Sequence, residues 1–130
     1  MGTTDKTAKG KGITKVQDEI ANMLLRYKSH IDNFGISYKD NTLCVEISKN
    51  RETFNERYAD HRLFEFAYLK GSAYKYTIES RTGVYGHSNK YGYGYGSWYA
   101  NNDDYIVKEK DIVETIETYI REQLIMYMQW

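Results

Sequence analysis

The hydrophobic positions follow a helical period near both ends of the chain and a strand period between them. From Thr14 to Gly35, apolar residues recur three or four positions apart, which predicts an amphipathic helix. Thr14 and Gln17 have the spacing of a capping box at its start, and Asp111 and Glu114 have a similar spacing before a second helix. The two apolar stripes consist of Val16, Ile20, Met23, Leu24, Tyr27 and Ile31, and of Ile112, Val113, Ile116, Ile120, Leu124 and Tyr127.

Alternating apolar and polar residues after the first helix predict a hairpin with a two-residue turn at Asp40-Asn41. This turn aligns the apolar residues on one face and places Cys44 opposite Ser37 on the other. A shift of one residue would mix the two faces, so the pattern specifies the register. The predicted apolar pairs are Phe34 with Ile47, Ile36 with Val45, and Tyr38 with Leu43.

The next segments are charged and then aromatic. Residues 49–60 contain few apolar positions, which favours a short helix or an irregular crossing. A second hairpin is predicted from His61 to Arg81 with a three-residue loop, Leu69-Lys70-Gly71, and Gly71 in the left-handed conformation. This loop would pair Phe66 with Tyr74, Phe64 with Tyr76, Ala67 with Ala73, and Glu65 with Lys75. A short strand is expected at residues 105–107.

These elements predict an α+β fold. We expect a mainly antiparallel sheet of about four to six strands, with the long amphipathic N- and C-terminal helices on one face. The chain has 130 residues, enough for one hydrophobic core. Residues 1–12 contain little besides Lys, Thr and Gly and are interpreted as a flexible tail, which leaves residues 13–130 as a single globular domain.

Composition narrows the possible functions. Lys plus Arg and Asp plus Glu each number 18, so the net charge is zero, which argues against a polybasic binder and against an acidic mimic of nucleic acid. The sequence contains no run of about 18 apolar residues, so it predicts no membrane-spanning helix. The first residues also lack the apolar stretch of a secretory signal peptide. The single cysteine, Cys44, excludes an internal disulfide and fits a reducing, cytoplasmic location, where we expect an inert thiol.

The sequence contains no pattern typical of a metal, cofactor or nucleotide site. The three histidines, at positions 30, 61 and 87, are far apart, and Gly92, Gly94 and Gly96 alternate with tyrosines rather than forming a phosphate-binding loop. No residue is therefore assigned as catalytic. His61 lies near Asp60 in sequence, with Arg57, Arg62 and Glu65 as further groups that a metal-independent ribonuclease could use. An ordinary charged strand end explains these residues more simply.

The most distinctive segment is residues 83–100, which hold five of the 14 tyrosines and five of the ten glycines. We call it the Gly/Tyr-rich segment. It could be a packed hairpin whose glycines allow close backbone approach, or an exposed surface of aromatic rings. The number of aromatic rings favours the second interpretation, because tyrosine supplies a large contact area with few rotatable bonds. The predicted partner-binding residues are Tyr85, Lys90, Tyr91, Tyr93, Tyr95, Trp98 and Tyr99.

We expect a non-catalytic binding protein that engages a macromolecular protein partner and could inhibit it. Protein interfaces depend on aromatic anchors more than on charge, whereas nucleic-acid binding draws much of its strength from neutralised phosphates. Single-stranded nucleic-acid binding, with bases stacked on the same tyrosines, is the alternative. A small ribonuclease around His61 is the second alternative.

The end of the chain predicts a homodimer. Six of its last seven residues are apolar, which is more than one core-facing stripe needs. A C-terminus enclosed between the sheet and the Gly/Tyr-rich segment is the other interpretation. The residues expected in the dimer contact are Leu124, Ile125, Tyr127, Met128 and Trp130.

Overall fold

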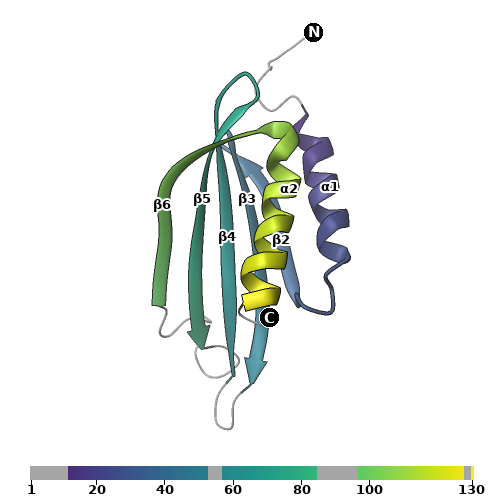
Figure 1. Ribbon diagram of the computed structural model, residues 1–130, viewed down its shortest axis with the longest axis vertical. Helices are drawn as coiled ribbons and strands as arrows, with labels where there is room; N and C mark the ends of the chain where they lie inside the picture. Colours follow the sequence, from purple (N-terminus) through teal and green to yellow (C-terminus); the bar gives the residue numbers. More distant parts are fainter. Residues whose placement is uncertain (1–11, 53–56, 85–96, 128–129) are drawn as a thin grey trace.

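The computed structural model describes residues 12–52, 57–84, 97–127 and 130 and has an α+β fold (Figure 1). Helix α1 (Ile13–Leu25) is followed by strands β2 (Asn33–Lys39), β3 (Thr42–Glu52), β4 (Arg57–Lys70), β5 (Ala73–Val84) and β6 (Ser97–Lys108). The chain continues into the 3₁₀ turn η1 (Glu109–Asp111), helix α2 (Ile112–Tyr119) and the π-helical segment η2 (Ile120–Tyr127). The strands form an antiparallel sheet in the order β2-β3-β4-β5-β6. The predicted fold class, with a helix at each end, is confirmed.

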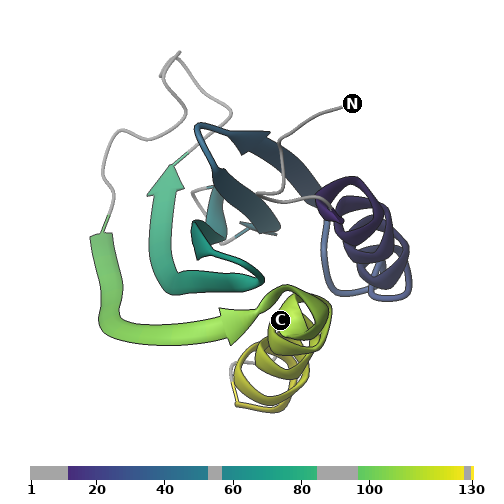
Figure 2. The same cartoon turned by 90° about the horizontal axis from the view of Figure 1, so that it is seen from above.

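Alternate strand positions and the apolar stripes of the helices share one hydrophobic core. Figures 1 and 2 show α1 and α2 side by side next to a curved sheet. We call the strand face that supplies the core the inner face, and the opposite face the outer face. The core includes Leu43, Val45 and Ile47 of β3, Phe64 and Phe66 of β4, Tyr74, Tyr76 and Ile78 of β5, and Ile20, Leu24, Ile112, Ile116 and Leu124 of the helical segments.

Polar contacts join the two helices at the end of α1. The hydroxyl of Tyr27 donates a hydrogen bond to Glu117 Oε2 at 2.6 Å, and Arg26 Nη2 lies 3.1 Å from the same oxygen. The hydrogen bond from Tyr27 is the main reason why the pKa of Glu117 lies below its usual value. The helices are therefore held together by a short charged hydrogen bond as well as by the core.

The predicted capping box at the start of α1 is wrong. Thr14 lies inside the helix, and the N-cap position is Gly12, which offers no side-chain hydrogen bond. A Cβ atom on Gly12 would lie only 2.5 Å from Glu109 Oε2, so the absence of a side chain lets α1 begin against η1. The helix also ends earlier than predicted, at Leu25, and Gly35 lies within β2.

The register of the first hairpin is confirmed. Phe34 is opposite Ile47, Ile36 opposite Val45, and Tyr38 opposite Leu43. Asp40 and Asn41 both have positive φ, 54° and 61°, as a type I′ turn requires. The expectation that all six apolar residues line the core fails for Phe34, which is exposed because it lies on the edge strand β2.

The register of the second hairpin differs from the prediction by two residues. Phe66 is opposite Tyr76 rather than Tyr74, and Phe64 is opposite Ile78. The pairing shifts between Tyr68 and Lys70, so Leu69 is an extra residue and the loop contains only Gly71 and Ser72. Because the difference is an even number of residues, the same side chains still face the core. Gly71 has the expected left-handed conformation, with φ of 59°.

Two further expectations about the strands are wrong. Residues 49–52 and 57–60 continue the β3–β4 pairing as far as Glu52 opposite Arg57, so there is no helix or crossing in them. Their charges are accommodated as ion pairs, with Arg51 Nε 2.6 Å from Asp60 Oδ2. Strand β6 is also much longer than residues 105–107, because its pairing with β5 continues beyond a register shift opposite residues 76–78.

Two of the residues predicted for the dimer contact at the end of the chain are buried. Leu124 is fully buried, and Trp130 is only 6% exposed, so neither is available to a second copy. Trp130 N donates to the carbonyl of Leu124, and His30 Nδ1 lies 2.9 Å from the carbonyl oxygen of Trp130. Of the other predicted contacts, Ile125 packs against the core, Tyr127 is 70% exposed, and Met128 lies outside the described residues.

Candidate functional site on the outer face and strand β6

The predicted aromatic binding residues fall partly outside the described residues. Tyr85, Lys90, Tyr91, Tyr93 and Tyr95 belong to residues 85–96, which lie outside them. The backbone of Trp98 and Tyr99 is part of β6, where position 98 is opposite Arg81 and position 99 is opposite Ser80. The Gly/Tyr-rich segment therefore leads directly from β5 into β6.

Strand β6 is an edge of the sheet within the described part of the chain. Its neighbour on one side is β5, and the sheet order ends with it. Edge strands offer backbone N–H and C=O groups to an additional strand. Two adjacent large side chains near its end are exposed, Tyr105 at 55% and Ile106 at 68%. The apolar residues 105–107 predict a strand here, but the sequence does not indicate that the strand lies at the edge of the sheet.

On the outer face, one row of positions opposite one another crosses all five strands, and its members in β2 to β5 are polar. Residues opposite one another in neighbouring strands lie on the same face of a sheet. The row begins at Asn33 in β2, passes through Ser48 in β3, His61 in β4 and Arg81 in β5, and ends at position 98 in β6. A histidine and an arginine are thus in register with one of the predicted aromatic residues.

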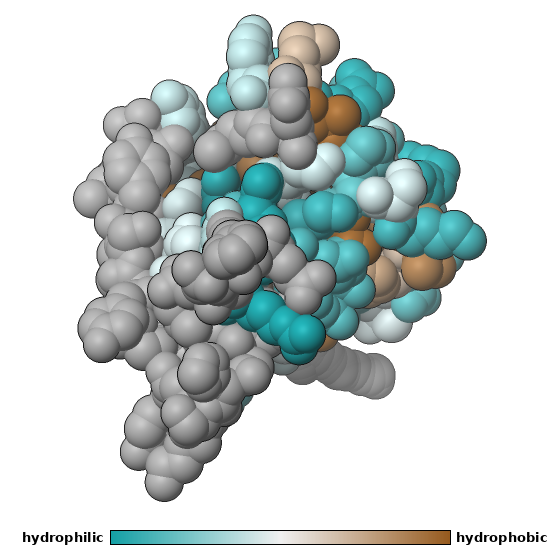
Figure 3. All heavy atoms as spheres, turned by 90° about the horizontal axis from the view of Figure 1, so that it is seen from below, coloured by the Kyte–Doolittle hydropathy of each residue, from teal (hydrophilic) through white to brown (hydrophobic). Residues whose placement is uncertain are grey.

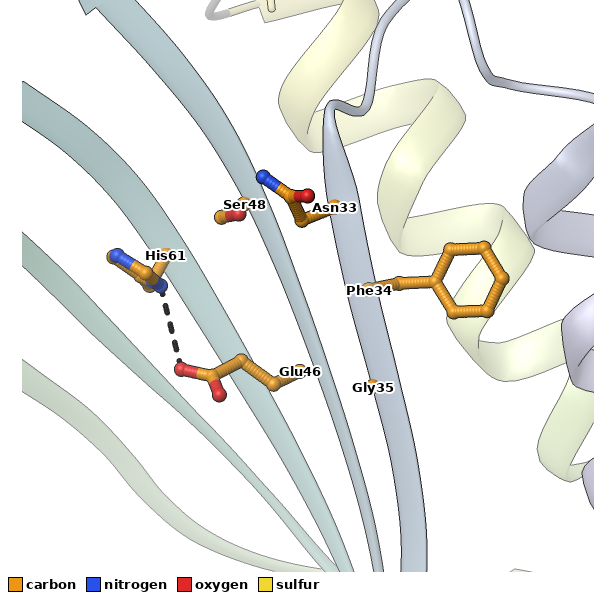
Figure 4. Close-up of a pocket in the computed structure, with 6 residues that line it drawn as sticks. All are labelled: Asn33, Phe34, Gly35, Glu46, Ser48 and His61. Carbon is orange, nitrogen blue, oxygen red and sulfur yellow. Dashed lines mark ion pairs between the residues drawn. The ribbon is translucent and has the colours of Figure 1, made fainter.

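A hollow of about 370 Å³ lies at the β2 end of this row (Figure 4). Gly35 is opposite Glu46 and has no side chain, and no atom lies within 4 Å of where its Cβ would be. A glycine inside a strand often marks a place where another group approaches the backbone. The lining residues are Asn33, Phe34, Gly35, Glu46, Ser48 and His61.

His61 and Glu46 face each other across β3 and β4 in this hollow. Figure 4 shows the two side chains pointing toward one another, with Nδ1 of His61 3.3 Å from Oε2 of Glu46. The hydrogen bond with His61 lowers the pKa of Glu46, although partial burial opposes this effect. The pair can orient a polar ligand, because it presents a carboxylate and an imidazole ring from adjacent strands.

The predicted charged group around His61 is only partly assembled. Arg62 is buried on the inner face, where its Nε donates a hydrogen bond to the hydroxyl of Tyr119 at 3.2 Å. Its Cζ lies 5.3 Å from the centre of the Trp130 ring. Because successive residues of a strand point to opposite faces, Arg62 cannot share a site with His61. Glu46 takes the place that the sequence suggested for Glu65. The sequence does not indicate Glu46 as a partner of His61, because their contact depends on the pairing of β3 with β4.

Cys44 is half-buried on the outer face, opposite Ser37 as predicted. Its sulfur lies 3.9 Å from Glu65 Oε2. Burial raises the pKa of the Cys44 thiol, and the negative charge of Glu65 raises it further. A thiol with a raised pKa has little of the reactive thiolate at neutral pH, so the environment does not support a nucleophilic cysteine.

Three further features of the described residues concern metal binding, membrane-spanning helices and the hydropathy of the surface. Among them, no group of three or more His, Cys, Asp and Glu side chains is arranged to hold a metal ion. No described helix is long and apolar enough to cross a membrane. Seen from below, the described surface is largely hydrophilic, with hydrophobic side chains in separate small areas (Figure 3).

The comparisons with known proteins found no relative of this chain. No protein-family model matches the chain, and no curated protein or solved structure matches it either.

Proposed function

We propose that this protein is a non-catalytic binding protein that engages another protein through the Gly/Tyr-rich segment and β6. The observation that carries the proposal is the place of this segment in the chain, between the last two strands and leading into an edge strand. Such a strand offers backbone hydrogen-bonding groups, and the segment adds aromatic side chains. Blocking a site on the partner would make the protein an inhibitor.

The exposed side chains of β6 support this assignment. Tyr105 and Ile106 extend the apolar character of the segment to the end of the strand. Tyrosine is enriched among the residues that contribute most to protein–protein affinity, because it combines a large apolar ring with a hydroxyl group. We further propose that α1 and α2 cover only the inner face, which leaves the outer face open to the partner.

The test compares partner capture by the intact protein and by a variant with Tyr91, Tyr93 and Tyr95 all changed to Ser. Purified protein is immobilised, the captured protein is identified, and binding is then measured with the purified partner. We expect the triple variant to lose binding. The matched control is Tyr127→Ser, which removes a tyrosine that is 70% exposed on η2, far from β6 in sequence.

The outcome depends on both binding and thermal stability. The proposal requires the triple variant to keep a melting temperature near that of the wild type while losing the partner, and Tyr127→Ser to retain it. A large fall in melting temperature would mean that the three rings are part of the core. Equal binding by all proteins would place the contact elsewhere.

Single-stranded nucleic-acid binding is the second candidate. The row that joins His61, Arg81 and position 98 supports it, because arginine and aromatic residues are usual elements of such sites. Fluorescence anisotropy with labelled single-stranded oligonucleotides separates the two functions. Nucleic-acid binding would weaken steeply with salt, because phosphate contacts release counterions.

A further inference from the structure

The hollow at the β2 end of the outer face has a buried polar floor and an exposed rim. Ser48 and His61 form the floor and are only 7% and 9% exposed, whereas Asn33 and Gly35 at the rim are exposed. The carboxylate of Glu46 connects the two levels, with 45% of its side chain exposed. The four polar side chains lie on the same side of the sheet (Figure 4). A small group can therefore reach the floor from solvent.

Oxygen atoms of two side chains in this hollow lack a hydrogen-bond partner within the part of the chain that the structure describes. One is the hydroxyl of Ser48, a side chain that is more than nine-tenths buried. The other is Oε1 of Glu46, because Nδ1 of His61 contacts the other oxygen, Oε2, at 3.3 Å. Buried polar groups nearly always have a partner. An unsatisfied hydroxyl beside a carboxylate therefore indicates a place for a ligand that supplies hydrogen-bond donors.

The charge of the hollow is negative. The six described residues that line it include one carboxylate, Glu46, and neither lysine nor arginine. The hydrogen bond with His61 and, more weakly, the charge of Arg81 lower the pKa of Glu46, although partial burial opposes them, so the carboxylate is ionised at neutral pH. Arg81 itself forms an ion pair with Glu79, with 3.0 Å between Nε and Oε1. The hollow therefore suits a cation.

The acceptors of the hollow lie in several directions. Glu46 and Ser48 are two positions apart on β3, which separates their Cα atoms by about 7 Å, and Asn33 lies opposite Ser48 on β2. A guanidinium group spreads five N–H donors over one plane, whereas an ammonium group has its three donors on one atom. At Gly35 no described atom lies within 4 Å of the Cβ position, so a flat group has room to lie against the backbone.

We propose that this hollow binds a guanidinium group, with Glu46 as its charged acceptor, Ser48 as its buried acceptor and the backbone of Gly35 as the surface beneath it. His61 is a positioning residue, because it holds Glu46 through Oε2 and leaves Oε1 to the ligand. The site does not depend on the Gly/Tyr-rich segment, since β2 and β6 are opposite edges of the described sheet. The guanidinium group can belong to a small molecule or to an arginine side chain of a protein.

The experiment is an NMR titration of the isotope-labelled full chain near pH 7, with Nα-acetyl-arginine amide as the ligand. We expect saturable shifts of the amide signals of residues 33–35 and 46–48, with a dissociation constant on the order of 1 mM, because a small ligand in an open hollow buries little surface. Nα-acetyl-citrulline amide has the same shape without the charge and should bind at least about tenfold more weakly. Methylguanidinium separates the two sources. Equal affinity for it favours a small molecule, and much weaker binding favours an arginine of a protein.

Variants of the chain test the place of binding. Glu46→Gln removes the charged acceptor and should weaken binding of the arginine ligand at least about tenfold. Gly35→Val fills the space against the backbone with a strand-favouring residue and should weaken binding as much. Glu65→Gln is the matched control, because it removes one carboxylate from the same face of the sheet, opposite Cys44, and it should bind like the wild type. A thermal scan verifies that each variant is folded.

Several results would overturn the proposal. One is equal affinity of the wild type and Glu46→Gln for the arginine ligand. Another is equal binding of the citrulline compound or of Nα-acetyl-lysine amide, because neither carries a guanidinium group. An equal loss in Glu65→Gln also overturns it, since binding would then follow the net charge of the face rather than the hollow.

Discussion

Gly12 is the position where adding one methyl group should have the clearest effect on stability. A Cβ at this position would lie 2.5 Å from Oε2 and 3.5 Å from Cδ of Glu109. The other carboxylate oxygen, Oε1, accepts a 2.7 Å hydrogen bond from the hydroxyl of Tyr74. Tyr74 is completely buried, and burial together with this bond raises the pKa of its hydroxyl far above the usual value. Gly12→Ala should therefore push Glu109 away from a buried hydroxyl that needs it.

The expected cost follows from this displaced hydrogen bond. A bond from a neutral donor to a charged acceptor contributes about 1.5–3 kcal/mol, and alanine in place of a glycine N-cap adds roughly 0.5–1 kcal/mol. We expect Gly12→Ala to lower the free energy of unfolding by about 2 kcal/mol. For a chain of this size the melting temperature should fall by about 8 °C. Urea denaturation followed by tryptophan fluorescence measures the first quantity, and a thermal scan measures the second.

Gly35→Ala is the matched control for this prediction. No atom lies within 4 Å of its Cβ position, and Gly35 lies inside β2, so alanine there should stabilise the protein by about 0.5–1 kcal/mol. The mechanism is tested in a Tyr74→Phe background, where no hydroxyl depends on Glu109. There, Gly12→Ala should cost much less. Equal costs in both backgrounds would refute the proposed route through Tyr74.

Three further predictions concern other parts of the fold. Glu117→Gln should cost about 1 kcal/mol near pH 7 by weakening the bond from Tyr27. Because the pKa of Glu117 is lowered in the folded protein, the difference in free energy of unfolding between the wild type and this variant should shrink as the pH falls below about 4.3. Urea titrations at several pH values measure this difference, and a constant value would contradict the prediction. Cys44 should react with iodoacetamide more slowly in the folded protein than in urea at pH 7.5, since burial and Glu65 raise its pKa; equal rates would contradict a shielded thiol. Asn41→Gly should stabilise the protein by about 0.5 kcal/mol, because position 41 has φ of 61°, and a lower stability in urea would contradict the turn.

The two hairpins explain which registers a sequence can reveal. At Asp40-Asn41 the turn residues and the apolar alternation both specify the same pairing, and the structure has it. In the second hairpin the alternation specifies the face but not the register, because the predicted and observed pairings differ by two residues and this difference leaves the same side chains on each face. The extra residue at Leu69 leaves no distinct signal in hydrophobic periodicity.

The candidate site was harder to predict than the fold. The sequence indicates His61 as a candidate, but its contact with Glu46 depends on the pairing of β3 with β4, and the few apolar positions in residues 49–60 favour a helix or crossing there instead of strands. The start of α1 was misplaced for a related reason. Gly12 is required by its contact with Glu109, 97 positions away, and local capping patterns contain no information about such a contact.

The central claim is that the Gly/Tyr-rich segment is a binding surface for a protein. Calorimetric titration of the purified partner into the wild-type protein and into the variant with Tyr91, Tyr93 and Tyr95 changed to Ser tests it most directly. Three contact tyrosines that each contribute about 1–2 kcal/mol predict a loss of affinity of at least about 100-fold, at a nearly unchanged melting temperature. An unchanged dissociation constant would contradict the claim.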